Sequence, residues 1–570
     1  MKIEEIIPVA LGKVPADVLL TNCKIVNVFT GNIEEGNIAL YRKRIAGVGD
    51  YRSGKKVIDL EGNYVVPGLI DAHVHIESSM VDPVEFARTI LPRGTTTIIA
   101  DPHEIANVIG TTGIEYMLQY TEGIPLNIYM MIPSCVPTTK METSGSEITS
   151  IDTIALVTKY PRVLGLGEVM NYPGVINTDR DLMTKIEIIR HLYKKIDGHA
   201  PGLSGKSLNA YASAFIRTDH ECTNESEALE KISRGMQVLI REGSVARNLD
   251  DLIGAVTAQN ERFFSFCTDD RHPDDIVKDG HIDNMVRRAI SKGIDPIIAI
   301  RMATINSAQF YGLRSMGAIA PSYKADMIVT ESLENFFPKI VIKDSKIIAR
   351  DGKLTTDVVG NNIEQKLDGN FKITKIEEDD LTILSNGNQT RAIRVFNDSI
   401  VTSEEIFDIP PAKVPDVKND LLKIAVVSRY SSEKSVFAGA VTGFGIKNGA
   451  IATSVGHDSH NMSVVGTNDL DMVLAINEIL NMKGGIVVSS NGHIIAKLPL
   501  SIGGLMSSLT TEEVVKKIKE LKEAARSIGC IINDPFMVLS FVQLAVIPKL
   551  RITNFGLVDV TKGNFVNIGI

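Results

Sequence analysis

The chain has 570 residues and a formal net charge of −9, and 44% of its residues are hydrophobic while 23% are charged. That length exceeds one ordinary domain, and the acidic balance argues against a nonspecific nucleic-acid binder, which usually carries a basic stripe. The N-terminal residues lack a signal-peptide core, no apolar run reaches membrane-span length, and the five cysteines form no C-x-x-C pair. We therefore expect a cytoplasmic protein of two or three domains, with reduced thiols and with no nucleic-acid or membrane partner.

Short β-strands separated by turn residues are predicted in the first 66 positions. Their apolar runs are 17–20, 24–28, 37–41 and 44–48. Similar runs return much later in the chain, at 325–329, 339–343 and 346–352. We predict that residues 1–66 and 311–370 form one β-sandwich domain, which is split around the segment between them.

That intervening segment, residues 67–310, alternates short apolar runs with helical stretches, a pattern typical of βα units and a parallel sheet. Eight runs can be counted, at 69–70, 96–100, 127–132, 163–166, just before His199, 215–217, 237–240 and 263–267. Eight βα units close into a (β/α)8 barrel, in which catalytic residues lie at the C-terminal ends of the strands. The predicted fold class is α/β: a (β/α)8 catalytic barrel, the split β-sandwich and a C-terminal α/β domain.

The C-terminal α/β domain is predicted over 385–570, with a strand at 422–427 and helices at 469–481 and 511–527. Its polar run His457-Asp458-Ser459-His460-Asn461 has three interpretations. It can be a surface loop, or a loop that packs over the barrel mouth and closes the pocket or contacts a second subunit. It can also be a metal site, because His457 and His460 are three residues apart, but the sequence shows no third ligand nearby.

Histidines and carboxylates follow several barrel strands and indicate a metal site. His73 and His75 are two apart, so in a strand they point to the same face and can hold one ion. His199 and His220 end two consecutive strands and can hold a second ion, with Glu168 as the bridging anion. Asp269, after the last strand, can ligate a metal and accept a proton from water. The set permits Fe(II), Mn(II) or Zn(II), and ligand softness does not decide between them.

Longer motifs resemble a known family. Pro67-Gly68-Leu69-Ile70-Asp71-Ala72-His73-Val74-His75, the split sandwich and the strand-eight Asp269 resemble the amidohydrolase superfamily. Segments 73–80, 101–108, 197–203, 218–221, 241–244 and 268–273, with 455–461 and 503–507, resemble the bacterial and archaeal adenine deaminases. This resemblance implies hydrolytic deamination of adenine to hypoxanthine and ammonia in purine salvage, by a metal-activated hydroxide. It also implies two divalent ions, manganese or iron in preference to zinc.

Roles for individual residues are predicted within this resemblance. The metal ligands are His73, His75, Glu168, His199, His220 and Asp269. Asp269 and His220 are the catalytic candidates, and the substrate-binding candidates are Glu77, Ser78, His103 and Asp270. We expect Glu77 to meet a ring nitrogen of the purine base, although it can instead orient a metal histidine. The expected partner is a small purine base, and the expected assembly is a homodimer or higher homo-oligomer.

Two alternatives remain open at this stage. The chain can be a metal-dependent N-acetyl sugar phosphate deacetylase, which also uses a bridging Glu, but Arg241 and Arg247 are its only obvious phosphate ligands. It can also be a non-catalytic scaffold that has kept the barrel, although a scaffold has no need of the full ligand set.

Overall fold

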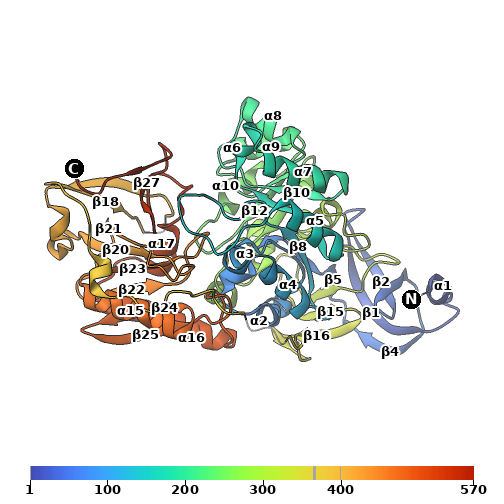
Figure 1. Cartoon of the computed structure of the whole chain (residues 1–570). Coiled ribbons are helices and arrows are strands. Elements are labelled where there is room, and N and C mark those ends of the chain that lie inside the picture. The colour runs from blue at the N-terminus through green and yellow to red at the C-terminus, as the bar shows by residue number, and fades with distance from the viewer. Residues whose placement is uncertain (1, 364–366, 398) are drawn as a thin grey trace.

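The computed structural model describes residues 2–363, 367–397 and 399–570. Three parts follow one another along the long axis of the molecule (Figure 1). The N-terminal sheet lies at one end, the barrel lies in the middle and the C-terminal sheet lies at the other end. The N- and C-termini are consequently far apart.

A nine-stranded sheet contains strands from both sides of the barrel. Its strands are β1 (Ala16–Asn27), β2 (Asn32–Tyr41), β3 (Arg44–Gly49), β4 (Gly54–Asp59), β5 (Tyr64–Pro67), β14 (Met327–Thr330), β15 (Ile340–Lys343), β16 (Lys346–Arg350) and β17 (Lys353–Leu354). β5 pairs antiparallel with β14, so Val65 lies opposite Val329, and both side chains are fully buried. β1 carries buried Leu19, Leu20, Ile25 and Val26, whereas none of the residues of β4 is buried, as expected for a strand at the margin of the sheet.

The barrel consists of eight parallel strands. They are β6 (Leu69–Val74), β7 (Thr95–Ala100), β8 (Asn127–Ile132), β9 (Val163–Val169), β10 (Lys195–Gly198), β11 (Thr218–Asp219), β12 (Gln237–Arg241) and β13 (Phe264–Cys267). β6 to β10 form one continuous ladder and β11 to β13 another. The amide of Arg217 donates to Ile196 O at 3.1 Å and joins the ladders on one side. The amide of Asp269 donates to His73 O at 3.0 Å and closes the barrel on the other.

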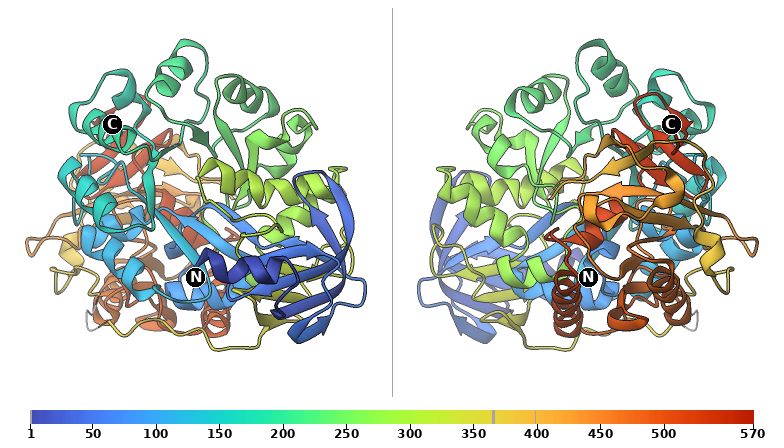
Figure 2. Two further views of the ribbon diagram at one scale, coloured as in Figure 1. Left: turned by 90° about the vertical axis from the view of Figure 1, so that its right-hand side faces the viewer. Right: turned by 90° about the vertical axis from the view of Figure 1, so that its left-hand side faces the viewer.

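The helices lie outside the strands (Figure 2). Those between or after the barrel strands include α2 (Pro83–Ile90), α3 (His103–Ile109), α4 (Thr111–Tyr120), α5 (Ser150–Lys159), α7 (Arg180–His191), α8 (Gly205–Ser213), α9 (Glu225–Ser233), α11 (Pro273–Asp279), α12 (Ile282–Ser291), α13 (Pro296–Met302) and α14 (Ile305–Phe310). Several begin at a side-chain cap: Asp82, Thr149 and Asn224 each accept a hydrogen bond from a backbone amide of the first turn. The predicted (β/α)8 architecture is confirmed.

The sixth strand lies later in the chain than expected. Residues 215–217 were the predicted run, but the strand is β11, Thr218–Asp219. Phe215 has φ of 63°, a left-handed conformation in the turn after α8, and the residue is 47% exposed. In the predicted run 215–217, Arg217 alone forms backbone hydrogen bonds to the neighbouring strands, through its amide to Ile196 O and through its carbonyl from the amide of Gln237.

The C-terminal part is built on an eight-stranded sheet with the order β19-β18-β21-β20-β23-β22-β24-β25. These strands are β18 (Thr390–Arg394), β19 (Ser403–Phe407), β20 (Leu422–Val427), β21 (Val436–Thr442), β22 (Ala450–Thr453), β23 (Met462–Gly466), β24 (Gly485–Ser490) and β25 (His493–Pro499). The two predicted helices are present as α15 (Asp469–Met482) and α16 (Thr511–Ser527). α16 begins at Thr510, whose side chain forms a capping box with Glu513.

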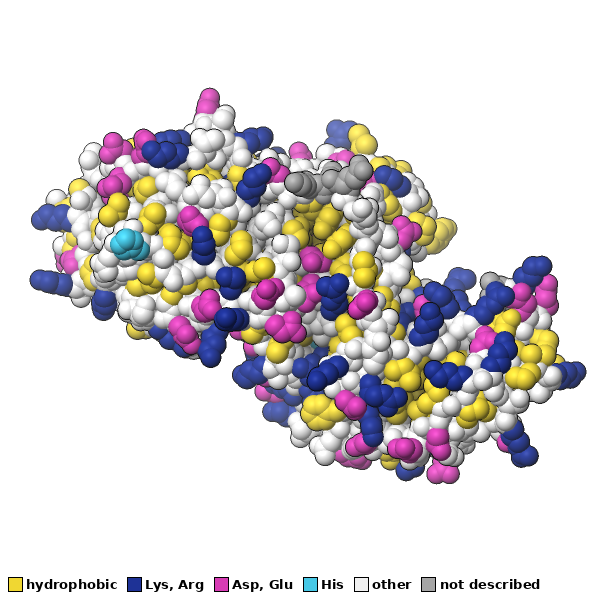
Figure 3. Space-filling model, turned by 90° about the horizontal axis from the view of Figure 1, so that it is seen from below, with side chains coloured by type: hydrophobic (Ala, Val, Ile, Leu, Met, Phe, Trp, Pro, Cys, Tyr) yellow, Lys and Arg dark blue, Asp and Glu magenta, His cyan; other side chains and the backbone are white. Residues whose placement is uncertain are grey.

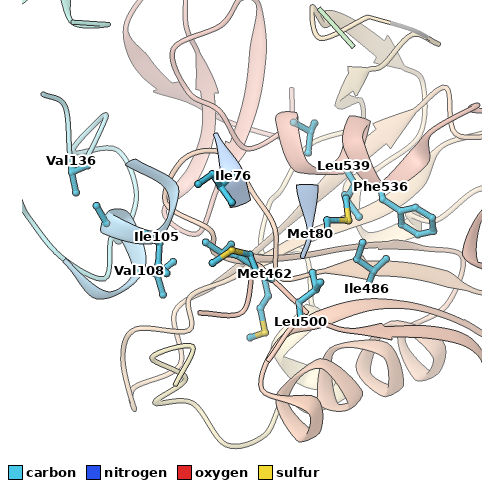
Figure 4. Close-up of a cluster of buried hydrophobic side chains, with 14 of the residues drawn as sticks. Ile76, Met80, Ile105, Val108, Val136, Met462, Ile486, Leu500, Phe536 and Leu539 are labelled. Carbon is cyan, nitrogen blue, oxygen red and sulfur yellow. The ribbon is translucent and has the colours of Figure 1, made fainter. Parts of the chain in front are cut away.

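An apolar cluster joins the barrel to the C-terminal part (Figure 4). Ile76, Met80 and Ile105 come from the barrel loops and helices, and they belong to the same buried cluster as Met462, Ile486, Leu500, Phe536 and Leu539 of the C-terminal part. Backbone contacts reinforce it, since the amide of Ser507 donates to Met80 O at 2.8 Å. Burying large apolar side chains stabilises by roughly 1.5–3 kcal/mol each, so the two parts share a core and are not loosely tethered.

Acidic and basic side chains are interspersed on the face seen in Figure 3. Among the described residues, no helix is both long enough and apolar enough to span a bilayer. The domain boundaries 1–66 with 311–370, 67–310 and 385–570 stay a prediction.

Candidate functional site

Five barrel strands deliver the predicted ligands to one end of the barrel. His73 lies in β6 and His75 follows it; Glu168 lies in β9; His199, His220 and Asp269 follow β10, β11 and β13. This is the C-terminal strand end at which the barrel fold places reactive groups. Their side chains are buried, except that of His199, which is 27% exposed. The structure therefore brings all six predicted metal ligands together.

His73, His75 and Asp269 form one half of the cluster. The Nε2 atoms of His73 and His75 are 3.1 Å apart. Asp269 Oδ1 lies 3.5 Å from His73 Nε2 and 3.0 Å from His75 Nε2. Bonds of about 2.0–2.2 Å to a shared ion require ligand atoms near these separations. The three atoms therefore fit one divalent metal.

Glu168 lies between this half and the other two histidines. Its Oε1 is 3.3 Å from His75 Nε2, and its Oε2 is 2.8 Å from His199 Nδ1 and 3.3 Å from His220 Nε2. Burial would raise the pKa of Glu168, but hydrogen bonds from His199, His220 and His75 outweigh burial and hold it well below its ordinary value. An ionised carboxylate that offers one oxygen to each pair of imidazoles has the chemistry of a metal bridge.

Arg241 fixes the orientation of Asp269. Its Nη1 lies 2.7 Å from Asp269 Oδ2 and also contacts Glu221, so Oδ1 is the oxygen that faces the histidines. Burial would raise the pKa of Asp269, but Arg241, His73 and His75 lower it well below its ordinary value. The backbone of Asp269 has φ of 56°, a conformation that Asp and Asn tolerate better than most residues.

The substrate-binding candidates lie beside this cluster. Ser78 Oγ donates to Asp270 Oδ1 at 2.5 Å, and Glu77 Oε1 accepts from the amide of Ile105 at 3.1 Å. Glu77 Oε2 is buried and has no hydrogen-bond partner among the described residues. Burial raises the pKa of Glu77 to about 7, so this group can carry a proton near neutral pH.

The two ring nitrogens of His103 face different groups of carboxylates. Its Nδ1 is 3.4 Å from Glu168 Oε1, and its Nε2 faces Glu104 Oε1 at 3.4 Å and Asp458 Oδ1 at 3.9 Å. His103 thus lies between the strand-end cluster and the C-terminal part.

A small cavity of about 30 Å³ adjoins these residues at the junction between the barrel and the C-terminal part. Glu77, Ser78 and Glu104 line it on one side, and His457 and Met537 line it on the other. That volume holds about one or two water molecules.

The loop 457–461 is not a surface loop. His457, Asp458 and His460 are at most 4% exposed. Thr138 Oγ1 donates to Asp458 Oδ2 at 2.5 Å, and Asn461 Nδ2 donates to Thr143 O at 2.8 Å. The surface-loop interpretation is therefore wrong, and the loop packs against the barrel mouth. The packing partners lie more than 300 residues away in the sequence.

Supporting residues behind the cluster were missed by sequence reasoning. Asp219 Oδ1 accepts from the amide of Ala200 at 2.7 Å, and Asp219 Oδ2 lies 2.8 Å from Lys231 Nζ. Asp219 thereby ties together the segments that carry His199 and His220. The one available signal was the acidic residue that directly precedes His220, but nothing in the sequence pairs it with Lys231 on α9.

The two arginines proposed as phosphate ligands are already engaged. Arg241 is held by Asp269 and Glu221, and Arg247 lies 3.3 Å from Asp275 Oδ2. The sugar phosphate alternative therefore lacks a free cationic pair at this site.

Comparisons with known proteins agree with the geometry. The chain matches the profile of the amidohydrolase family over residues 64–359 and that of the adenine deaminase C-terminal domain over residues 399–564. It is 59% identical to an adenine deaminase of Kosmotoga olearia and 56% identical to one of Thermosipho africanus. Each alignment covers 100% of this chain and 99% of the relative. An adenine deaminase of Clostridium acetobutylicum is 46% identical, with 99% of each chain covered.

Proposed function

Because the chain belongs to the adenine deaminase family of the amidohydrolases, hydrolases that act on C–N bonds, we propose that its strand-end cluster deaminates adenine. Water adds at C6, the exocyclic C–N bond breaks, and the products are hypoxanthine and ammonia. The observation that carries the proposal is the position of Glu168, whose two oxygens face the two pairs of histidines.

The cluster would hold two divalent ions. His73, His75 and Asp269 would hold one, His199 and His220 would hold the other, and Glu168 would bridge them. When bound, such ions supply Lewis acidity, which lowers the pKa of a water molecule toward neutrality. The mixed nitrogen and oxygen donors support manganese or iron, with zinc as the third choice.

Residues of the chain itself transfer the protons and bind the purine base. Asp269 is ionised and accepts a proton from the attacking water at Oδ1, while His220 borders the same space. Glu77 Oε2 meets a ring nitrogen, and its raised pKa lets it share a proton with that atom. The Ser78–Asp270 pair contacts the purine edge. For His103, substrate binding stays a prediction.

Ammonia release tests the proposal. Protein freed of metal and then reconstituted with Mn(II) or Fe(II) should release ammonia from adenine. It should release no acetate from an N-acetyl sugar phosphate. Acetate release without ammonia release would instead favour the deacetylase alternative, and no turnover of either substrate with bound metal would favour a scaffold.

Replacing His75 with alanine should remove bound metal, because His75 Nε2 contacts His73, Glu168 and Asp269 within 3.3 Å. Elemental analysis after reconstitution should show fewer ions per chain than in the unchanged protein. His191→Ala is the matched control, since His191 is 70% exposed and lies on the outer helix α7. Full occupancy and activity in His75→Ala would refute the ligand assignment.

Replacing Glu77 with glutamine should lower the rate of deamination much more than the metal content. The amide keeps the hydrogen bond from Ile105 but cannot share a proton with the purine. We expect kcat/KM to fall by about 10²-fold or more, within the range of lost acid–base catalysis. If metal content and activity fall together, Glu77 orients a metal histidine instead.

The biological setting is proposed on the same basis. Family membership supports purine salvage with a small purine base as substrate, and a cytoplasmic location is proposed with that role. A homodimer or higher homo-oligomer stays a prediction.

A further inference from the structure

A second cluster of metal-binding side chains lies where the C-terminal part meets the barrel mouth. His103 and Glu104 come from the start of α3, and His457 and Asp458 come from the loop between β22 and β23. All four side chains are at least nine-tenths buried. We call this group the junction cluster. It shares no residue with the six predicted metal ligands of the strand-end cluster.

The four donor atoms of the junction cluster lie close to one another. Glu104 Oε1 lies 2.6 Å from His457 Nδ1 and 3.4 Å from His103 Nε2. Asp458 Oδ1 lies 3.7 Å from His457 Nδ1 and 3.9 Å from His103 Nε2. In a tetrahedral site with bonds of about 2.0–2.1 Å, neighbouring ligand atoms are about 3.3 Å apart. The separations of 2.6–3.9 Å bracket that value, so two imidazole nitrogens and two carboxylate oxygens lie close enough to share one ion after small side-chain shifts.

The second oxygen of each carboxylate is held by the protein. Thr138 Oγ1 donates to Asp458 Oδ2 at 2.5 Å. The amide of Gly456 donates to His460 Nδ1, so the proton of a neutral His460 is on Nε2, which contacts Glu104 Oε2. The free oxygens, Asp458 Oδ1 and Glu104 Oε1, are left facing the common centre. Partners that fix the outer atom of a ligand are typical of metal sites.

The histidines are oriented in the same manner. The ring of His457 stacks on Phe541, with centroids 4.4 Å apart, which holds Nδ1 toward the centre. His103 presents Nε2 to the centre while its Nδ1 faces Glu168 Oε1 at 3.4 Å. A histidine between a metal and a carboxylate has this disposition.

The buried carboxylate of Glu104 is positioned to act as a cation ligand. His460 Nε2 contacts Oε2, whereas Oε1, which faces His103 and His457, accepts no hydrogen bond of good geometry from any residue that the structure describes. A buried carboxylate without such bonds is costly unless a cation compensates it. Two carboxylates balance one divalent ion, so the junction cluster would be neutral when loaded.

We propose that His103, Glu104, His457 and Asp458 bind a further divalent transition-metal ion, which crosslinks the C-terminal part to the barrel mouth. The donor set suits Zn(II), Mn(II) or Fe(II). This assignment makes His103 a metal ligand in place of a substrate contact. It also supplies the additional ligands that the His457–His460 spacing lacked, from a segment some 350 residues earlier in the chain.

The number of metal ions bound per chain tests the proposal directly. Protein saturated with Zn(II) and then dialysed should hold one ion per chain more than the His457→Gln and Asp458→Asn variants treated identically. His493→Gln is the matched control, because His493 is exposed at the start of β25 in the same part of the molecule. It should keep the full complement. His75→Ala should lose metal from the strand-end cluster and still show the ion that His457→Gln removes.

Anomalous diffraction from the Co(II)-loaded protein gives a second readout that needs no variant. A peak within bonding distance of His457 Nδ1 and Asp458 Oδ1 is the expected result. Equal metal content in the unchanged protein and His457→Gln, or crystals of the Co(II)-loaded protein without a peak at this position, would overturn the proposal. The junction cluster would then be a network of ion pairs between imidazolium and carboxylate groups.

Discussion

Replacing Asp269 with asparagine should lower kcat for adenine by about 10²–10⁴-fold while the fold stays intact. Asp269 Oδ1 faces His73 and His75, whereas Oδ2 is held by Arg241 at 2.7 Å. The amide of asparagine has nearly the same shape, but it cannot take a proton from water. Because the effect is on proton transfer, KM should change much less than kcat.

Asparagine is also the cleanest substitution for the backbone. Asp269 has φ of 56°, and asparagine tolerates that conformation about as well as aspartate does. An alanine variant would add backbone strain and confuse the result. Asp50→Asn, which makes the same chemical change at a side chain 73% exposed, should keep the original rate. A near-normal kcat in Asp269→Asn would remove Asp269 from the proton-transfer role.

Replacing Lys231 with methionine should destabilise the protein by roughly 3–5 kcal/mol, because it leaves a buried carboxylate without its cation. Lys231 and Asp219 are both fully buried, and their charged atoms are 2.8 Å apart. Lys231 Nζ also donates to Ala200 O at 2.7 Å, next to His199. Burial would raise the pKa of Asp219, but Lys231 lowers it below its ordinary value, so the carboxylate stays charged.

Urea unfolding followed by circular dichroism measures this effect, since the chain contains no tryptophan for fluorescence. Lys159→Met is the matched control: Lys159 pairs with Glu115 at the surface and is 58% exposed, so its loss should change the unfolding midpoint little. Equal midpoints for the two variants would show that the buried pair contributes nothing beyond a surface pair.

Patterns within short stretches predicted the barrel and the family correctly. The apolar runs before His73, Asp101 and Glu168 became β6, β7 and β9, and α16 begins and ends at the predicted residues. Seven of the eight strand positions follow from local hydrophobicity. The sixth differs because Phe215 lies in a turn whose left-handed backbone has no signature in an apolar run. Amidohydrolase and adenine deaminase membership, inferred from motifs, is confirmed by the relatives.

Pairings between distant segments could not be predicted. Nothing in the sequence pairs Glu104, which directly follows His103, with His457 in the polar run 457–461. Their contact at 2.6 Å depends on how the C-terminal sheet docks on the barrel. Likewise, nothing in the sequence indicates that Lys231 is fully buried against Asp219. The spacing of charged residues along the sequence does not predict which of them pair in the folded protein.

The nine-stranded sheet pairs strands that are synthesised at very different times. β5 cannot pair with β14 until Val329, which lies opposite Val65 and roughly 260 residues later in the chain, has been synthesised. At a synthesis rate of about 5–20 residues per second, the partner strand appears roughly 13–52 s after β5. During that interval the edge of β5 is open while the barrel segment is still being made. The nascent chain is therefore most exposed to wrong strand pairing before residue 330 has left the ribosome.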